Sequence, residues 1–442
     1  MTQSLFTSRL PGFYQLSLTD RVAKVADLCN LSDEESEQLS QTGLAIETAD
    51  QMVENVIGTL GLPVGLGLNF RVNGRDLLVP MAVEEPSVIA AASFAARLAR
   101  EGGGFVAHAD RSLMIAQVQV IDYGNPAEAK ERLLAAKADL LALANAVHPS
   151  LHQRGGGAVD LEVRVLDAPE GPGGEPILVL HVIIDTRDAM GANLVNTVAE
   201  ALGPHVEAIS GGTVGLRILS NLADRRLARA RCRIPVSALQ TIDHSGEDVA
   251  SGVVQASRFA QADPYRAATH NKGVMNGVDA VAIATGNDWR AIEAGAHAYA
   301  CRDGRYGPLS TWAREGDCLV GHIELPLAVG TVGGTIKVHP HVRLMHRILG
   351  VRGAHELAEV MASVGLAQNF AALRALGSVG IQKGHMAQHA RCVALEAGAR
   401  GEQVHRLAAL LVEAGQVKVD RARELLGDLG NGSLHSPVIT EY

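Results

Sequence analysis

The 442-residue chain is short of several residue types, and each shortage argues against a class of protein. Aromatic residues make up only 3% of it. Its 39 basic residues are outnumbered by 48 acidic ones, so it lacks the positive excess that binding of nucleic-acid phosphates requires. Its five cysteines are scattered without a CxxC pair, which argues against a disulfide or zinc framework and predicts reduced thiols in a cytoplasmic protein.

Long hydrophobic runs and two nucleotide-binding signatures are also missing. No span of eighteen apolar residues occurs, and the first thirteen residues lack the basic and apolar regions of a signal peptide, so we expect a soluble, unexported protein. No GxGxxG follows a strand with an acidic residue about twenty positions on, and no Walker A sequence is present. The ordinary Rossmann and P-loop classes are therefore excluded.

The chain is rich in apolar residues (47%) and has 47 glycines, enough for a large core and typical of an α/β protein. The clearest architectural signal is a run of strand and helix patterns, at 113–121, 126–147, 160–166, 177–185, 192–210 and 213–220. Their order is β-α-β-β-α-β, which is typical of a ferredoxin-like split βαβ domain.

We therefore expect a multidomain α+β and α/β chain. Its parts are a large domain split between 1–111 and 222–378, the ferredoxin-like domain at 112–221, and a small helical unit at 379–442.

Polar residues crowd the stretch 263–290, DPYRAATHNKGVMNGVDAVAIATGNDWR. Its apolar run 278–284 is short enough to be a buried strand, with Lys272 before it and Asp288 after it. One interpretation is a solvated loop, a strand and a second loop. Because Asn and Asp gather at both ends while charges of one sign never run together, we favour a functional site.

Two other segments place polar groups at the start of a helix. Glu84-Glu85-Pro86-Ser87 precedes an Ala-rich helix at 88–100, where a carboxylate serves either as a structural cap or as a functional acid. Asp188-Ala189-Met190-Gly191-Ala192-Asn193 enters the second helix of the ferredoxin-like pattern and exposes backbone N–H groups suited to a pyrophosphate. The second signal is weak alone, because many helices begin with Asp and Gly as caps.

Two histidines, His385 and His389, fall at i and i+4 in a helical pattern near the C-terminus. The spacing suits a shared zinc ion, but the Glu of an HExxH site and a third ligand are both missing. We therefore predict no metal, and a structural pair is the ordinary alternative.

The strings THNKGVMNG and ATGNDWRAIEAGAHAYA resemble the core signature of 3-hydroxy-3-methylglutaryl-CoA (HMG-CoA) reductase, in its soluble bacterial class II form. Further strings match in the family's order over nearly the whole chain, at 54–59 (ENVIGT), 84–87, 188–193, 326–334 and 383–386 (KGHM). The resemblance implies a large α/β domain around a central helix, an inserted cofactor domain and a C-terminal flap. It also implies a homodimer with its active site between subunits, and neither a nucleic-acid nor a membrane partner.

The implied reaction interconverts HMG-CoA and mevalonate plus CoA, through mevaldehyde, with two nicotinamide dinucleotides. Similarity to enzymes of mevalonate-consuming bacteria favours the oxidative direction. By the resemblance, Lys272 is the cation beside the oxyanion, Glu85 the acid, and His385 the proton donor to the CoA thiolate. Asp288 keeps Lys272 charged and helps to keep Glu85 protonated. The implied substrate-binding positions are Ser87, Arg266, Asn276, Gln368 and Leu376, and the implied cofactor positions are Asp188, Met190, Gly191, Ala192, Asn193, Asn221 and His148.

His148 marks a departure from the family pattern. NAD-preferring relatives carry an Asp ahead of the glycine loop that begins at Gly155, and alignment on that loop places His148 there. The overall resemblance favours NAD(H), but a histidine does not repel a 2′-phosphate, so NADP(H) stays open. Two rival functions also stay open: a catalytically idle CoA-ester-binding or scaffold relative, and an unrelated NAD-dependent enzyme. The intact set of Glu85, Lys272, Asp288 and His385 counts against the first.

Overall fold

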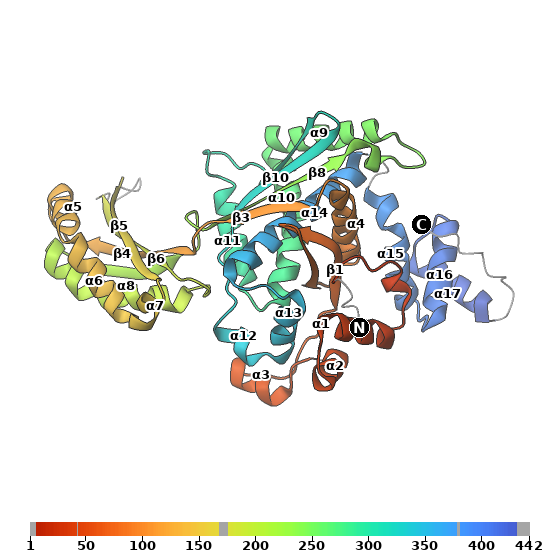
Figure 1. Cartoon of the computed structure of the whole chain (residues 1–442), viewed down its shortest axis with the longest axis horizontal. Helices are drawn as coiled ribbons and strands as arrows, with labels where there is room; N and C mark the ends of the chain where they lie inside the picture. The colour runs from red at the N-terminus through yellow and green to blue at the C-terminus, as the bar shows by residue number, and fades with distance from the viewer. Residues whose placement is uncertain (1–5, 42, 168–175, 378–380, 431–442) are drawn as a thin grey trace.

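Two separate β-sheets organise the chain, one at an end of the molecule and one in its central body (Figure 1). The computed structural model describes residues 6–41, 43–167, 176–377 and 381–430, and the side chains of 381–388 and of Gly430 lie outside that description. The smaller sheet has four antiparallel strands in the order β5-β6-β4-β7, and the larger has six in the order β2-β1-β3-β8-β10-β9.

The four-stranded sheet confirms the predicted split βαβ order. Its elements are β4 (Leu113–Ile121), α5 (Pro126–Ala135), α6 (Lys137–Val147), α7 (Pro149–Gln153), β5 (Gly157–Leu166), β6 (Ile177–Asp185), α8 (Ala192–Ser210) and β7 (Thr213–Ser220). Alternate residues of β4, such as Met114, Ala116 and Val118, are fully buried against the helices, as period-two alternation requires. The prediction of a single helix over 126–147 was wrong, because the helix is interrupted at Ala136 and forms α5 and α6.

The central body is built on the six-stranded sheet. Its strands are β1 (Val64–Val72), β2 (Arg75–Ala82), β3 (Phe105–Ala109), β8 (Leu227–Pro235), β9 (Ser310–Glu315) and β10 (Cys318–Pro326). Its longer helices are α4 (Val88–Glu101), α9 (Gly246–Ala262), α10 (Pro264–Ala284), α11 (Trp289–Tyr299) and α14 (Ala354–Gly377). The N-terminal helices are α1 (Leu18–Cys29), α2 (Asp33–Ser40) and α3 (Ile46–Met52), and α12 (Gly334–Val338) and α13 (Pro340–Leu349) lie near them (Figure 1). Two short 3-10 helices cover Phe13–Gln15 and Val236–Leu239.

The C-terminal helices α15 (Ile381–Glu396), α16 (Glu402–Glu413) and α17 (Val419–Gly430) pack around a small core of their own. They lie on the side of the body opposite the four-stranded sheet (Figure 1). None of the helices in the described ranges is long and apolar enough to cross a membrane.

One local prediction of the sequence was wrong. The apolar run 278–284 is not a strand but the last two turns of the central helix α10. This stretch is buried nearly all round, so it lacks the polar face that reveals a helical period. The string at 54–59 follows α3, which stops at Met52, and the chain continues from there through a turn toward β1.

Glycines let α10 pack closely on α14. A Cβ at Gly277 would lie 3.0 Å from the Cβ of Gln368, and one at Gly365 would lie 2.9 Å from Val278. Because a helix repeats every 3.6 residues, Lys272, Asn276 and Asp279 share one face of α10 instead of standing at opposite ends of a strand.

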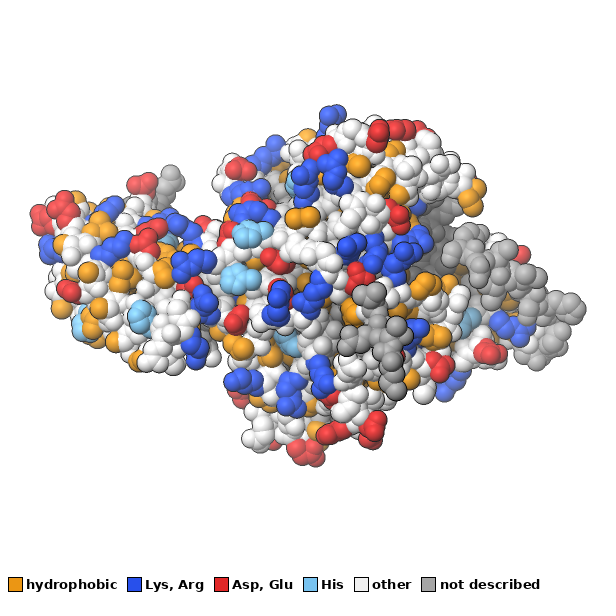
Figure 2. Space-filling view, viewed as in Figure 1, with side chains coloured by type: hydrophobic (Ala, Val, Ile, Leu, Met, Phe, Trp, Pro, Cys, Tyr) orange, Lys and Arg blue, Asp and Glu red, His pale blue; other side chains and the backbone are white. Residues whose placement is uncertain are grey.

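Charges of both signs are interspersed on the surface in view (Figure 2). The outward arginines of β8 illustrate the pattern. Arg231 and Arg233 both contact Glu315, at 2.8 and 2.9 Å, and Arg229 contacts Asp110 at 2.9 Å. The positive charge of this strand is therefore largely neutralised within the chain.

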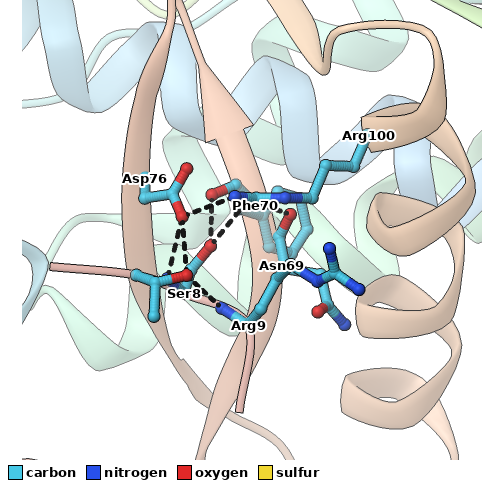
Figure 3. A network of polar contacts seen from close by, with 7 residues as sticks. Ser8, Arg9, Asn69, Phe70, Asp76 and Arg100 are labelled. Carbon is cyan, nitrogen blue, oxygen red and sulfur yellow. Dashed lines mark hydrogen bonds and ion pairs between the residues drawn. The ribbon is translucent and has the colours of Figure 1, made fainter. Parts of the chain in front are cut away.

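The N-terminal segment is fastened to the β1–β2 hairpin by a polar network around Asp76 (Figure 3). One carboxylate oxygen of Asp76 accepts from Arg100 at 2.7 Å, from the backbone N–H of Ser8 at 3.0 Å and from the Thr7 hydroxyl at 3.2 Å. The Ser8 hydroxyl donates to the carbonyl of Phe70 at 2.8 Å. Burial opposes ionisation of Asp76, but these bonds outweigh it and hold the pKa of the carboxyl below 3.8.

We expect Asp76→Asn to lower the free energy of unfolding of the central body by about 1–3 kcal/mol, the usual cost of losing a charge-assisted hydrogen bond. Because the folded-state pKa is depressed, the stabilisation is present above the unfolded-state value near 3.8 and disappears as pH falls through the folded-state value. Melting curves should therefore show a constant difference from about pH 8 to about pH 5 that narrows below about pH 4. Asp303→Asn, at an exposed carboxylate, is the control. A difference that persists undiminished in acid would contradict the assignment.

Candidate functional site

An ion pair joins the two segments that the sequence singled out. The Nζ of Lys272 on α10 lies 3.0 Å from the Oε2 of Glu85, and the Asn276 side-chain amide donates to the same oxygen at 3.4 Å. Both charged side chains are about half exposed, at 63% and 43%, so a substrate can reach them. A cation, a carboxyl group and an amide thus converge on one point, which is what stabilisation and protonation of a developing oxyanion require.

The local backbone explains why Glu85 points at α10. The chain leaves β2 at Ala82, turns through Glu85, and enters α4 at Val88. Ser87 adopts a left-handed conformation (φ 80°), which is strained for a residue with a Cβ. The α4 helix packs on β1 and α14, and α14 packs on α10, so the turn is held against the central helix.

Three of the other predicted substrate positions lie on α10 and α14. Arg266 is in the first turn of α10, and burial lowers the pKa of its guanidinium. Gln368 on α14 is buried beside Gly277, one residue from Asn276, and its side-chain oxygen has no hydrogen-bond partner among the described residues. Leu376 stands apart, 42% exposed near the end of α14.

Asp288 follows α10 by one turn and begins α11. Its Oδ1 accepts from the backbone N–H of Ala291 at 3.2 Å, as a helix cap, and lies 3.4 Å from Arg290. Within the described part of the chain it makes no direct bond to Lys272 or Glu85. The structure therefore brings Glu85, Lys272 and Asn276 together. Asp288 instead caps the helix that it begins, α11.

The sequence did not reveal a half-buried carboxyl pair, Asp279 on α10 and Glu293 on α11. Burial, followed by the hydrogen bond and charge of Glu293, raises the pKa of Asp279 to about 8. The hydrogen bond from His297 lowers the pKa of Glu293, so the protonated form is favoured at Asp279 and the ionised form at Glu293. His297 Nε2 lies 2.6 Å from Glu293, which raises the pKa of His297.

Hydrogen bonds also connect the Glu293–His297 side of this cluster to the buried face of α10. His297 Nδ1 lies 2.7 Å from the Tyr306 hydroxyl, to which the Asn271 side chain donates at 3.1 Å. Asn271 precedes Lys272 in the sequence, but its side chain is buried on another face of the helix. The i, i+4 spacing of Glu293 and His297 indicates that these two side chains meet on one helix. Nothing in the sequence indicates that they also contact residues of α10.

The second cluster of predicted residues lies at the start of α8. Gly191 has φ 101° and offers no side-chain cap, so the N–H groups of the first helical turn, at Ala192 and Asn193, are left for an anion. A Cβ at Gly191 would lie 2.4 Å from the Thr186 side chain, which explains the glycine. Asp188 instead accepts from the backbone N–H of Ala354 at 3.0 Å. The turn thus fits a pyrophosphate, with Asp188 tying it to α14.

The two remaining cofactor positions, His148 and Asn221, lie on other elements. His148 stands at the junction of α6 and α7, and its ring Nε2 is buried without a partner among the described residues. The glycine loop after α7 packs on the strand end that precedes the turn, since a Cβ at Gly156 would lie 2.8 Å from the carbonyl of Asp185. The carbonyl of Asn221, after β7, lies against Gly295 of α11.

His385 lies on α15, and its side chain is outside the described residues. His389, one turn later, is exposed. Among the residues that the structure describes, no group of three His, Cys, Asp or Glu side chains is placed to hold a metal ion.

Comparison with known proteins decides the family. The profile described as "Hydroxymethylglutaryl-coenzyme A reductase" matches residues 17–390. The chain belongs to the HMG-CoA reductase family. It is 51% identical over 422 residues to the HMG-CoA reductase of Archaeoglobus fulgidus, covering 95% of this chain and 94% of that one. It is 36% identical to a probable HMG-CoA reductase of Borreliella burgdorferi over 76% of each chain.

Solved HMG-CoA reductases share the fold. An enzyme from Streptococcus pneumoniae superposes with a TM-score of 0.80 at 45% identity, covering 95% of this chain and 99% of that one. A class II structure from the same organism, bound to NADPH in open conformations, gives 0.79 at 47% identity over 83% of this chain and 99% of that one. The chain is thus an NAD(P)-dependent oxidoreductase of the class II HMG-CoA reductase type, as the motifs predicted.

Proposed function

We propose that the chain interconverts (S)-HMG-CoA and (R)-mevalonate at the point where Lys272, Glu85 and Asn276 meet. The convergence of Lys272 and Asn276 on one Glu85 oxygen, at 3.0 and 3.4 Å, carries the proposal. An idle CoA-ester-binding relative would have no need to hold a lysine and a carboxylate together in an accessible position.

The residues have separate tasks in the proposed reduction. HMG-CoA, two NAD(P)H and two protons give mevalonate, CoA and two NAD(P)+, with the nicotinamide supplying a hydride in each half. Lys272 stabilises the oxyanion formed on the thioester carbonyl and again on mevaldehyde. Glu85 protonates the aldehyde oxygen, and His385 protonates the departing CoA sulfur. Ser87, Arg266, Asn276, Gln368 and Leu376 surround the acyl group, with Arg266 facing its carboxylate.

Both nicotinamide cofactors fit these observations. The uncapped first turn of α8 supports a pyrophosphate there, with Asp188, Met190 and Gly191 forming the turn. The family resemblance favours NAD(H), while the related class II structure from Streptococcus pneumoniae holds NADPH.

We propose a homodimer because Ile57 and Leu60, in the string at 54–59 and just after it, are wholly exposed apolar side chains. A cytoplasmic location and the mevalonate-oxidising direction stay predictions.

The absorbance of the reduced nicotinamide tests the proposal with HMG-CoA plus NADH or NADPH, and in reverse with mevalonate, CoA and the oxidised cofactors. We expect cofactor turnover in both directions that depends on the acyl substrate. A folded protein that binds HMG-CoA without oxidising either cofactor would support the binding or scaffold function instead.

Cofactor choice gives a further prediction at His148. If this residue lies beside the adenosine ribose, His148→Asp shifts preference toward NAD(H), because a carboxylate repels the 2′-phosphate of NADP(H). The measurement is the ratio of kcat/KM for the two cofactors, which should change by about tenfold. His152→Asp, on the short helix α7, is the matched control. An unchanged ratio in the His148 variant would place the selectivity elsewhere.

A further inference from the structure

Arg226 is a buried cation at the crossing between the two sheets. It lies in the turn that leaves β7 and enters β8, where the chain returns from the four-stranded sheet to the central body (Figure 1). The residue is only 4% exposed. Burial lowers the pKa of its guanidinium to about 10, so the group stays protonated at neutral pH.

The guanidinium is held by oxygen atoms from both parts of the chain. Its Nη1 donates to the Thr186 hydroxyl at 3.2 Å, to the carbonyl of Ala189 at 3.3 Å and to that of Met190 at 3.2 Å. Its Nη2 donates to the carbonyl of Val329, in the glycine-rich loop after β10. One planar fork thus joins the turn at 188–191 to a loop of the central body.

The same loop is fixed to the turn between α10 and α11. The N–H of Gly330 donates to the Asn287 side chain at 2.7 Å, and Asn287 precedes Asp288. The N–H of Thr331 donates to the carbonyl of Asp188 at 2.9 Å. A Cβ at Gly330 would lie 2.5 Å from the backbone nitrogen of Met190, so this contact leaves no room for a side chain.

We propose that Arg226 is a positioning residue for the nicotinamide dinucleotide, because it holds the turn at 188–191 in a fixed place relative to the turn at 287–288. The inference rests on the proposed function. Without the fork, three backbone carbonyls lose a charged donor, and the first turn of α8 is no longer held at a set distance from Lys272. The acyl site is built on α10 and on the turn before α4, so it does not depend on this contact.

Three variants and a control test the role. Arg226→Met removes the charge and the fork, and Arg226→Lys keeps the charge but cannot bridge several acceptors. Gly330→Ala keeps Arg226 in the chain but adds a Cβ that forces the loop at 329–331 away from Met190. Arg229→Met, three residues further on, removes a half-buried arginine that pairs with Asp110 and Glu324. Each is measured for Kd of NADH and NADPH by quenching of their fluorescence without HMG-CoA, for KM of both substrates, and for Tm.

We expect Arg226→Met to weaken dinucleotide binding by about tenfold to a hundredfold, the effect of losing charge-assisted hydrogen bonds. Arg226→Lys and Gly330→Ala should each raise the dinucleotide Kd by about threefold or more, while the KM of HMG-CoA stays within about twofold. Arg229→Met should change neither constant.

An unchanged dinucleotide Kd in a folded Arg226→Met protein overturns the inference. If that variant fails to fold, unchanged Kd values in Arg226→Lys and Gly330→Ala overturn it equally. Parallel rises in KM for HMG-CoA and for the dinucleotide would also overturn it, because they would indicate that the whole active site is less well ordered. Failure of the proposed function looks different: the unaltered protein itself would then bind neither dinucleotide.

Discussion

Lys272→Ala lowers turnover in both directions by about a thousandfold or more while the protein stays folded. Removing one group that stabilises an oxyanion costs about 3–4 kcal/mol, and Lys272 serves both hydride steps. The side chain is 63% exposed and packs into no core, so its loss leaves the central helix intact. Steady-state rates with HMG-CoA and with mevalonate plus CoA give the effect.

The control is Lys130→Ala, a lysine of α5 in the domain of the four-stranded sheet, which should leave both rates unchanged. Circular dichroism and Tm confirm that the Lys272 variant is folded. A folded Lys272→Ala protein with near-normal turnover would remove Lys272 from the mechanism and leave its contact with Glu85 as a structural ion pair.

The sequence was informative about this site because its residues lie in short, local strings. Lys272 and Asn276 are four residues apart, and Glu85 stands just before the Ala-rich helix that the sequence predicts at 88–100. Their meeting point was not predictable from periodicity, since the sequence suggested a strand at 278–284. The buried surface of α10 explains the error: a helix surrounded by α14, α9 and β2 has no polar stripe to mark its period.

Arg225 and Arg226 show more clearly what cannot be predicted from the sequence alone. In the sequence they are equivalent neighbours in a charged turn, Asp224-Arg225-Arg226. In the structure Arg225 is exposed and pairs with Glu162 at 2.9 Å, whereas Arg226 is buried among carbonyls. Which of two adjacent arginines is buried depends on the packing of the glycine-rich loop, more than a hundred residues away at Val329. No local pattern encodes that choice.

The ferredoxin-like domain was the most predictable part of the fold. Strands such as β5 alternate apolar and polar residues, and the order of elements admits few topologies. Cofactor choice was not predictable to the same degree, because it depends on single contacts to a ribose or a 2′-phosphate. The buried Nε2 of His148, which has no partner among the described residues, is the kind of detail that only the packing of α6 and α7 supplies.

His385→Gln separates the two halves of the proposed reaction. If His385 protonates the departing CoA sulfur, it acts only when a thiol leaves or, in reverse, when a thiol is deprotonated to attack the aldehyde. A thiol has a pKa of roughly 8.5, so a thiolate released near neutral pH re-adds to mevaldehyde unless a proton traps it. General acid catalysis of this kind contributes about 10²- to 10⁴-fold.

We therefore expect His385→Gln to lower HMG-CoA reduction and CoA-dependent mevalonate oxidation by about that factor. Reduction of free mevaldehyde to mevalonate should fall far less, because Glu85 and Lys272 complete that step and no thiol departs. His389→Gln is the matched control: it changes an exposed histidine one turn further along α15 and should be mild in both assays.

The ratio of the thioester and aldehyde rates carries the test, because it cancels any general loss of folded enzyme. A proton donor changes that ratio, since only one of the two half-reactions has a leaving thiol. Loss of closure by the C-terminal helices would instead slow both half-reactions alike, because each needs the acyl group and the cofactor enclosed together. Equal losses in His385→Gln would thus assign the residue to closure, and the source of the proton for CoA would have to be sought elsewhere.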